Sequence, residues 1–171
     1  MTKQLRNIIL IGPMGSGKTS TGRVLAKEIN HIFLDTDEEV TRRTGVSIAY
    51  IFDIEKESGF REREYQALKS LMENENSVIA TGGGIVTHKQ SRKLIKNHAN
   101  IVYLKTGIQK QIERATVSEN RPLLIDTDPE KKLKELMLTR APLYEEISNI
   151  KINTDKKTPK ELALEIIEQL R

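Results

Sequence analysis

Residues 12–19 carry the most specific chemical signal in the sequence, because they match the pattern of a Walker A loop. They read Gly-Pro-Met-Gly-Ser-Gly-Lys-Thr and lie between an apolar run at 8–11 and a segment with helical spacing. In such a loop, backbone N–H groups and the start of the following helix surround phosphate oxygens. Lys18 would reach the β- and γ-phosphates of a nucleotide, and the Thr19 hydroxyl would ligate Mg²⁺.

Two carboxylates, Asp35 and Asp37, follow a second apolar segment at 31–34. The two carboxylates leave the strand at alternate positions, and their side chains are expected to start on opposite faces. We therefore expect the two acids to have different roles. Asp35 can support Mg²⁺ beside Thr19, and Asp37 can accept a hydrogen bond from an acceptor hydroxyl and act as its base. The alternative is that both acids only stabilise the N-terminus of the next helix.

A triple glycine at 82–84 and three arginines are candidates for binding a second ligand. Without side chains, the glycines allow a small molecule to approach the backbone. Arg61 and Arg140 could grip a carboxylate or phosphate with two-pronged hydrogen bonds. Arg121 lies in a polar segment at 118–128 without apolar periodicity, which is typical of a lid. For each arginine, the alternative is an ordinary surface ion pair.

Five apolar segments that alternate with helical ones are expected to position these residues. Continuous apolar runs are typical of strands buried in a parallel sheet, and we expect them at 7–11, 31–34, 77–80, 100–104 and 147–152. Helices are expected between them, including one over 60–72 and one from 129 that Pro142 ends or kinks. This order predicts a three-layer α/β/α fold with a five-stranded parallel sheet. Ligands of such sheets bind beyond the carboxyl ends of the strands, where the candidate residues fall.

The composition narrows the class of protein. The chain has 171 residues, of which 37% are hydrophobic and 30% charged, as expected of one soluble globular domain. It has no cysteine, which excludes disulfides, thiolate metal sites and a cysteine nucleophile. The apolar run at 8–11 is too short for a signal peptide or a membrane span, so we expect a cytoplasmic protein. The formal charge is +4, but basic and acidic residues alternate, which favours a solvated surface over a nucleic-acid site.

Taken together, the motifs resemble those of one family, shikimate kinase, which has the P-loop fold of nucleoside-monophosphate kinases. The resemblance runs from Ile9 to about Pro159 and is carried by GPMGSGKTSTGRVLA, FLDTD, SIAYIF, FREREYQAL, TGGGIV, RPLL and RAPLYEEI. It implies a single domain over 1–171, with a substrate-binding region at about 36–63 and a lid at about 114–126. It also implies transfer of the γ-phosphoryl group of ATP to the 3-hydroxyl of shikimate, a step toward chorismate and the aromatic amino acids.

The resemblance assigns roles to individual residues by motif. Those implied to bind ATP are Gly15, Ser16, Gly17, Lys18, Thr19, Ser20, Arg114, Arg121 and Lys157. Those implied to bind shikimate are Asp37, Phe52, Phe60, Arg61, Gly83, Gly84 and Arg140. Thr19 and Asp35 would hold Mg²⁺, and the catalytic group would be Lys18, Asp37 and Arg121. From spacing alone, Phe52 and Phe60 could equally belong to the core.

The sequence departs from the family pattern at two places. Lys56-Glu57 stands where the family commonly has Gly-Glu, which leaves the local turn open. Lys157 stands where arginine is frequent, so stacking on adenine should be weaker. The alternatives are a related small-molecule kinase such as gluconate kinase, and a nucleotide-dependent binding module or nucleic-acid motor. We expect ATP and shikimate as the only partners, without nucleic acid or membrane, and a monomer.

Overall fold

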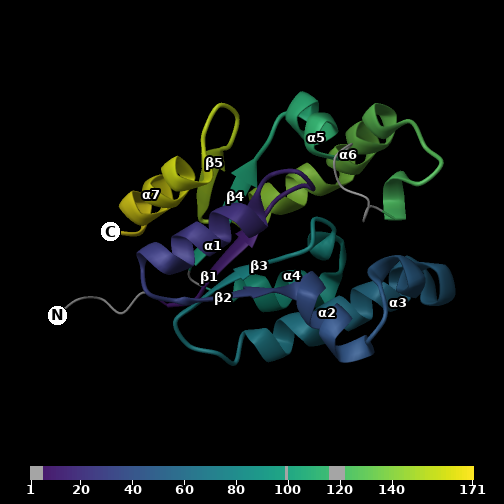
Figure 1. Cartoon of the computed structure of the whole chain (residues 1–171), viewed down its shortest axis with the longest axis horizontal. Helices are drawn as coiled ribbons and strands as arrows, with labels where there is room; N and C mark the ends of the chain where they lie inside the picture. Colours follow the sequence, from purple (N-terminus) through teal and green to yellow (C-terminus); the bar gives the residue numbers. More distant parts are fainter. Residues whose placement is uncertain (1–5, 99, 116–121) are drawn as a thin grey trace.

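The computed structural model describes residues 6–98, 100–115 and 122–171. Within these ranges, five strands form one sheet in the order β2-β3-β1-β4-β5 (Figure 1). The strands are β1 (Ile8–Ile11), β2 (Ile32–Asp35), β3 (Ser77–Ala80), β4 (Asn100–Lys105) and β5 (Ile150–Asn153). All neighbouring strands pair in parallel, so their carboxyl ends lie at one edge. The expected five-stranded parallel sheet is confirmed.

Helices cover both faces of the sheet (Figure 1). They are α1 (Lys18–Glu28), α2 (Thr36–Thr44), α3 (Ile48–Leu71), α4 (Lys89–Lys96), α5 (Ile108–Ala115), α6 (Pro129–Ile147) and α7 (Pro159–Leu170), with short 3₁₀ turns at η1 (Ile85–Thr87) and η2 (Pro122–Leu124). Side chains alternate along β1. Ile8 and Leu10 pack with residues of α1 and α7, whereas Ile9 and Ile11 pack with residues of α3, α4 and α6. This alternation gives the three layers that the sequence predicts.

A third hydrophobic cluster lies between α2 and α3, beside the carboxyl edge of the sheet. It contains the buried side chains of Val40, Ile48, Ile51, Phe60 and Ala67. This cluster is separate from the two clusters on the faces of the sheet. The α2–α3 region is therefore held together by its own hydrophobic contacts. Within the described ranges, no helix combines the length and the apolar composition that crossing a membrane requires.

Two predicted element boundaries are wrong. The helix expected over 60–72 starts before Phe60: α3 consists of two helical stretches that meet at a kink at Lys56, whose φ of 62° and ψ of −177° are not helical. The helix that contains Pro142 does not end there but continues to Ile147, so β5 begins later than expected. Proline removes the hydrogen bond to the carbonyl of Leu138, and Leu138 is exposed, so water can satisfy that group.

Candidate active site

The phosphate loop connects β1 to α1 and surrounds the side chain of Lys18. Gly15 and Gly17 have φ angles of 77° and 83°, a left-handed conformation that favours glycine. The Lys18 ammonium is buried and donates hydrogen bonds to the carbonyl oxygens of Gly12 (2.8 Å) and Pro13 (2.9 Å). It also lies 3.3 Å from the hydroxyl of Ser16, which is buried. The lysine charge is therefore held inside the loop at the positive end of α1.

Thr19 and Asp35 place two oxygen atoms together beside this loop. Thr19 lies in the exposed first turn of α1 with Ser20, and its hydroxyl donates to Oδ2 of Asp35 (3.0 Å). The other oxygen of Asp35, Oδ1, accepts from the backbone N–H groups of Asp37 (2.9 Å) and Glu38 (3.2 Å). Asp35 thus caps α2 with one oxygen and leaves the other beside Thr19. The two interpretations of Asp35 are compatible, because they use different oxygens.

This pair fits Mg²⁺ in its chemistry. Magnesium prefers oxygen ligands and is usually bound by one or two protein groups, with water and substrate phosphates completing its coordination. A hydroxyl and a carboxylate oxygen next to a phosphate loop supply that donor set. Among the described residues, no cluster of three or more histidine, aspartate or glutamate side chains forms a site of another kind.

Asp37 lies between the phosphate loop and the arginines in an environment that opposes its ionisation. The residue is partly buried, and its Oδ1 atom is enclosed without a hydrogen-bond partner among the described residues. Burial raises the pKa of Asp37 to about 7, and the neighbouring carboxylates of Glu64 and Asp35 act in the same direction. The positive charges of Lys18 and Arg61 oppose this shift only in part. Asp37 is therefore a carboxyl group whose charge changes near neutral pH, as suits a base.

The triple glycine follows β3 and is packed against charged side chains. A Cβ at Gly82 would lie 2.1 Å from Oε1 of Glu64, and one at Gly84 would lie 1.9 Å from an Nη2 atom of Arg61 and 2.7 Å from that of Arg140. Any side chain at these two positions would displace the ion pairs. The glycines are therefore required by the close approach of the carboxylate and the two guanidinium groups.

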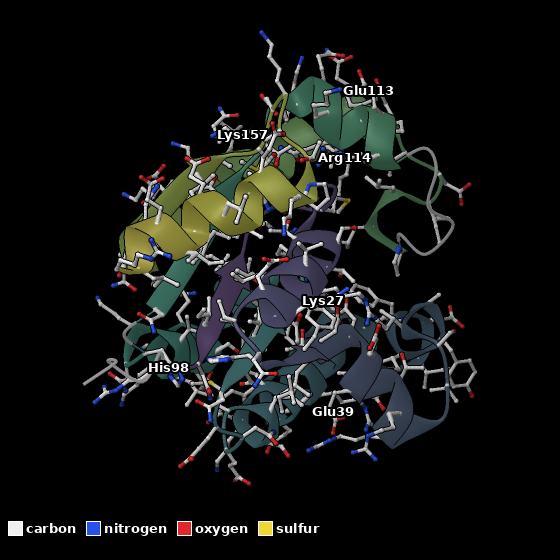
Figure 2. The ribbon with its side chains drawn as sticks, turned by 60° about the vertical axis from the view of Figure 1, so that its left-hand side comes forward. Lys27, Glu39, His98, Glu113, Arg114 and Lys157 are labelled. Carbon is white, nitrogen blue, oxygen red and sulfur yellow. The ribbon has the colours of Figure 1, made fainter. Side chains whose placement is uncertain are left out.

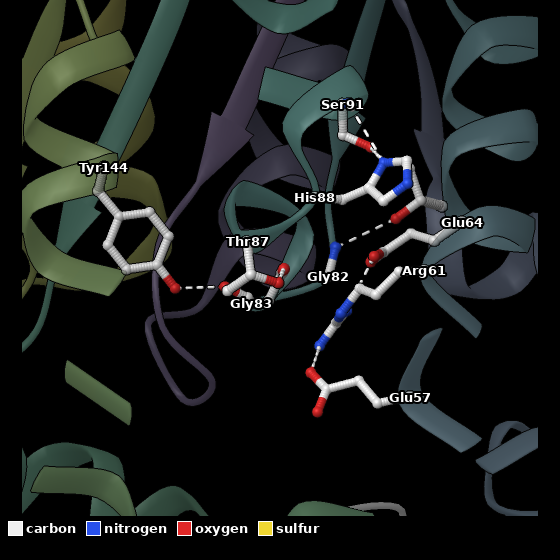
Figure 3. Close-up of polar contacts among 11 residues, drawn as sticks. Glu57, Arg61, Glu64, Gly82, Gly83, Thr87, His88, Ser91 and Tyr144 are labelled. Carbon is white, nitrogen blue, oxygen red and sulfur yellow. Dashed lines mark hydrogen bonds and ion pairs between the residues drawn. The ribbon is translucent and has the colours of Figure 1, made fainter. Parts of the chain in front are cut away.

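Arg61 and Arg140 lie in the interiors of α3 and α6, and both are buried. Arg61 donates to Glu64 (2.8 Å) and to Glu57 (3.1 Å), and Figure 3 shows its guanidinium between the two carboxylates. Burial lowers the pKa of Arg140, and the adjacent charge of Arg61 acts in the same direction. Two buried guanidinium groups at one glycine form a site with a strong preference for an anion.

A cavity of about 90 Å³ brings the candidate substrate residues together. It is lined by Met14, Asp37, Ile48, Phe52, Phe60, Arg61, Gly82, Gly83, Gly84, Pro122, Leu123 and Arg140. The rings of Phe52 and Phe60 have centroids 4.8 Å apart and form its apolar side. Phe60 also belongs to the buried α2–α3 cluster, so the same side chain packs in a hydrophobic core and lines the cavity.

Tyr144 is a residue of this region that the sequence did not single out. It is fully buried on α6, and its hydroxyl donates to the carbonyl oxygen of Gly83 (Figure 3). Its ring lies 4.9 Å from that of Tyr103 on β4. The signal that could have found it is its position four residues after Arg140, on the same face of the helix. Tyr144 holds the glycine turn that both arginines contact.

Comparison with known proteins agrees with this arrangement. The sequence profile of a family described as shikimate kinase matches residues 14–171. The chain belongs to the shikimate kinase family. A shikimate kinase of Pseudomonas syringae pv. tomato is 45% identical over 166 residues, which cover 97% of this chain and 96% of that protein.

Solved structures support the same family. A shikimate kinase from Acinetobacter baumannii, in complex with shikimate, has a TM-score of 0.95 at 42% identity, covering 98% of this chain and 94% of that one. A gluconokinase from Sinorhizobium meliloti has a TM-score of 0.65 at 16% identity, covering 96% and 90%. The second likeness concerns the fold alone.

The remaining residues predicted to bind ATP are Arg114, Arg121 and Lys157. Arg114 lies in the last turn of α5, and its guanidinium donates to the carbonyl oxygen of Gly15 in the phosphate loop. Lys157 lies between β5 and α7 and pairs with Glu165 (2.6 Å). Figure 2 shows Arg114 and Lys157 at the end of the molecule where α5 lies. Arg121 and the rest of 116–121 in the predicted lid lie outside the described residues.

Proposed function

We propose that the chain is a shikimate kinase that transfers the γ-phosphoryl group of ATP to the 3-hydroxyl of shikimate, giving shikimate 3-phosphate and ADP. The observation that carries this proposal is the pair of buried arginines at Gly84, beside Asp37 and facing the phosphate loop. ATP phosphates belong to the loop, so the arginine pair requires a second anion. A carboxylate on a small polyhydroxylated ring meets that requirement.

The cavity supports a specific orientation of shikimate. Its carboxylate would bind Arg61 and Arg140, and its ring would lie between the Phe52–Phe60 side and the backbone of the glycine turn. This leaves the hydroxyl groups toward Asp37. Holding both reactants in this way supplies a large part of the rate enhancement, because phosphoryl transfer depends mainly on positioning and charge stabilisation.

Lys18 would act on the phosphates of ATP, and Asp37 would act on the hydroxyl group that attacks them. The Lys18 ammonium neutralises charge on the β- and γ-phosphates, together with the N–H groups of Gly15 and Gly17. Asp37 accepts the hydrogen of the attacking hydroxyl and orients its oxygen toward the γ-phosphorus. The proton then resides on Asp37, whose raised pKa suits this transfer.

Thr19 and Asp35 would hold Mg²⁺ with ATP, since they provide the two adjacent oxygen atoms described above. The bound metal would supply charge neutralisation across the phosphates. The same proposal includes a cytoplasmic, monomeric enzyme whose partners are its two small-molecule substrates.

The main alternative is a gluconate kinase, because a gluconokinase shares the fold. Gluconate also has a carboxylate, but its hydroxyl groups lie on an open chain and not on a ring that could pack against Phe52 and Phe60. A nucleic-acid motor is disfavoured because β3 ends at Ala80 and is followed by Thr81, without the carboxylate that would activate water.

The test is a coupled ADP-release assay with shikimate, gluconate and nucleoside monophosphates as acceptors. We expect turnover with shikimate and a product phosphorylated at the 3-hydroxyl, as identified by ³¹P and ¹H NMR. Equal or faster turnover with gluconate or a nucleotide would refute the proposal. ATP hydrolysis that depends on added DNA or RNA would favour a motor.

A further inference from the structure

Arg61 has two carboxylate partners of different character. Glu64 is fully buried and accepts from Nη1 of Arg61 (2.8 Å). Glu57 accepts from Nη2 (3.1 Å), but 46% of its side chain is exposed to solvent. Moving Glu64 away from Arg61 would leave a charge enclosed in the protein, whereas Glu57 can turn into water at little cost. Only the contact with Glu57 is therefore easily exchanged.

The atom that Glu57 contacts is the one that faces the anion site. The Nη2 atom of Arg61 lies 1.9 Å from where a Cβ of Gly84 would be, and Nη2 of Arg140 lies 2.7 Å from the same point. Glu57 thus occupies the arm of Arg61 that lies next to Arg140. A carboxylate that binds both arginines has to use this arm.

The charges around the arginine pair point to an exchange rather than an addition. Arg61 and Arg140 carry two positive charges, and Glu64 and Glu57 carry two negative ones close to Arg61. A ligand carboxylate that enters while Glu57 stays would bring two carboxylates to the same Nη2 atom of Arg61, where their negative charges repel each other. If Glu57 leaves, the incoming carboxylate takes its place at this atom.

We infer that Glu57 is a placeholder for the substrate carboxylate: it covers Arg61 in the free enzyme and leaves when the substrate binds. This inference rests on the proposed function for the identity of the ligand. Its consequence is that Glu57 sets both the affinity for shikimate and the rejection of other small anions. A monocarboxylate with hydroxyl contacts to Asp37 displaces Glu57, whereas a simple inorganic anion lacks those contacts and competes poorly.

The opposite role is that Glu57 permanently orients Arg61. The two roles predict opposite effects of Glu57→Gln, because a placeholder competes with the ligand and an orienting group assists it. Glu55→Gln is a matched control. Glu55 lies two residues away and pairs with Arg63 (2.6 Å) on the partly exposed outer side of α3. Its substitution removes the same negative charge as Glu57→Gln.

The experiment measures shikimate binding by calorimetry for the parent, Glu57→Gln and Glu55→Gln. An exchangeable, half-exposed ion pair contributes a small free energy, so we expect Glu57→Gln to bind shikimate about two- to fivefold more tightly. Glu55→Gln should bind like the parent. Unchanged or weaker binding by Glu57→Gln would overturn the inference, and so would loss of folding, since a placeholder is not needed for the fold.

Sulfate provides a second measurement that does not depend on shikimate being the substrate. We expect 20 mM sodium sulfate, compared with sodium chloride of equal ionic strength, to raise the Tm of Glu57→Gln more than those of the parent and of Glu55→Gln. Equal shifts in all three proteins would count against the placeholder. A parent that binds no shikimate would contradict the proposed function instead, while the sulfate result would still decide the role of Glu57.

Discussion

At the scale of single residues, Asp37 has the most unusual environment in the site. Its pKa rises to about 7 because burial and the nearby carboxylates of Glu64 and Asp35 oppose the charged form. The carboxyl group of an ordinary aspartate loses its proton several pH units below neutrality. Asp37 loses its proton, and so becomes able to act as a base, only near neutral pH. The same shift has consequences for activity and for stability, and these can be measured separately.

For activity, we expect kcat/KM for shikimate to rise with pH and to level off above about 7, because Asp37 must be ionised to accept the hydroxyl hydrogen. The measurement is the pH profile of kcat/KM between pH 5.5 and 9 at saturating ATP and magnesium. A profile that is flat across this range would show that Asp37 does not act as the base.

For stability, Asp37 has a higher pKa in the folded protein, about 7, than its ordinary value of 3.8. Between these values the folded state binds more protons than the unfolded state, so the free energy of unfolding falls as pH rises through this window. Asp37→Asn cannot ionise, and we expect it to be more stable than the parent at pH 8 by about 1 to 3 kcal/mol. Urea unfolding at pH 4 and pH 8 tests this. Equal pH dependence in both proteins would contradict it.

Lys18 should be essential for transfer and dispensable for folding. Its ammonium fills the loop and donates hydrogen bonds to the carbonyl oxygens of Gly12 and Pro13. The backbone turn should form without these two hydrogen bonds. We expect Lys18→Ala to lower kcat by at least about a hundredfold, in the range for losing one charge-stabilising group. Circular dichroism should be unchanged. A folded Lys18→Ala protein with turnover near that of the parent would refute this role.

At the scale of elements, the interruption of α3 shows what the sequence could and could not predict. Lys56 stood out because it replaces a glycine common in the family. The structure has two helical stretches that meet at a kink at Lys56, whose φ of 62° and ψ of −177° form a conformation that essentially only glycine adopts without strain. Helical spacing could indicate the two stretches, but not that a single residue separates them.

This strain gives a prediction for Lys56→Gly. The Lys56 ammonium donates a hydrogen bond to the carbonyl oxygen of Asp53 (2.7 Å). Removing the strain should raise the free energy of unfolding by about 1 kcal/mol, despite the greater freedom of glycine in the unfolded chain. Lys69→Gly, at an exposed regular position of α3, should lower it by about 0.5 to 1 kcal/mol. Destabilisation by both substitutions would contradict the account of the kink.

At the scale of the whole molecule, the topology of the sheet brings together the phosphate loop, the segment after β2, α3, the glycine turn after β3 and α6. The apolar runs predicted which strands would be buried. Because ligands of parallel sheets bind beyond the carboxyl ends of the strands, the sequence also predicted that the phosphate loop, Asp35, Asp37 and the glycines would lie close together. The sequence could also select Arg61 and Arg140 as unusual. It could not predict their meeting at Gly84, because that depends on how α3 and α6 each pack against η1.

The different environments of the two carboxylates that pair with Arg61 were also beyond the reach of sequence patterns. Glu57 and Glu64 have the spacing of ordinary helical ion pairs with Arg61, and only burial distinguishes the enclosed carboxylate from the exposed one. Tyr144 was not singled out from the sequence, and its hydrogen bond to the carbonyl of Gly83 is visible only in the structure. Three-dimensional burial therefore supplied the information that spacing could not.

The most direct test of this account compares shikimate with its methyl ester as acceptors in the ADP-release assay. The ester keeps the ring and all three hydroxyl groups but has no charge for Arg61 and Arg140 to bind. Loss of a charge-assisted contact in a desolvated site weakens binding by about 2 to 4 kcal/mol, so we expect kcat/KM to fall roughly 30- to 1000-fold for the ester, with KM for ATP unchanged. Arg140→Lys should reduce turnover of shikimate much more than that of the ester, because a point charge does not replace a two-pronged grip. Equal kcat/KM for shikimate and its ester in the parent enzyme would contradict the claim that the arginine pair recognises the substrate carboxylate.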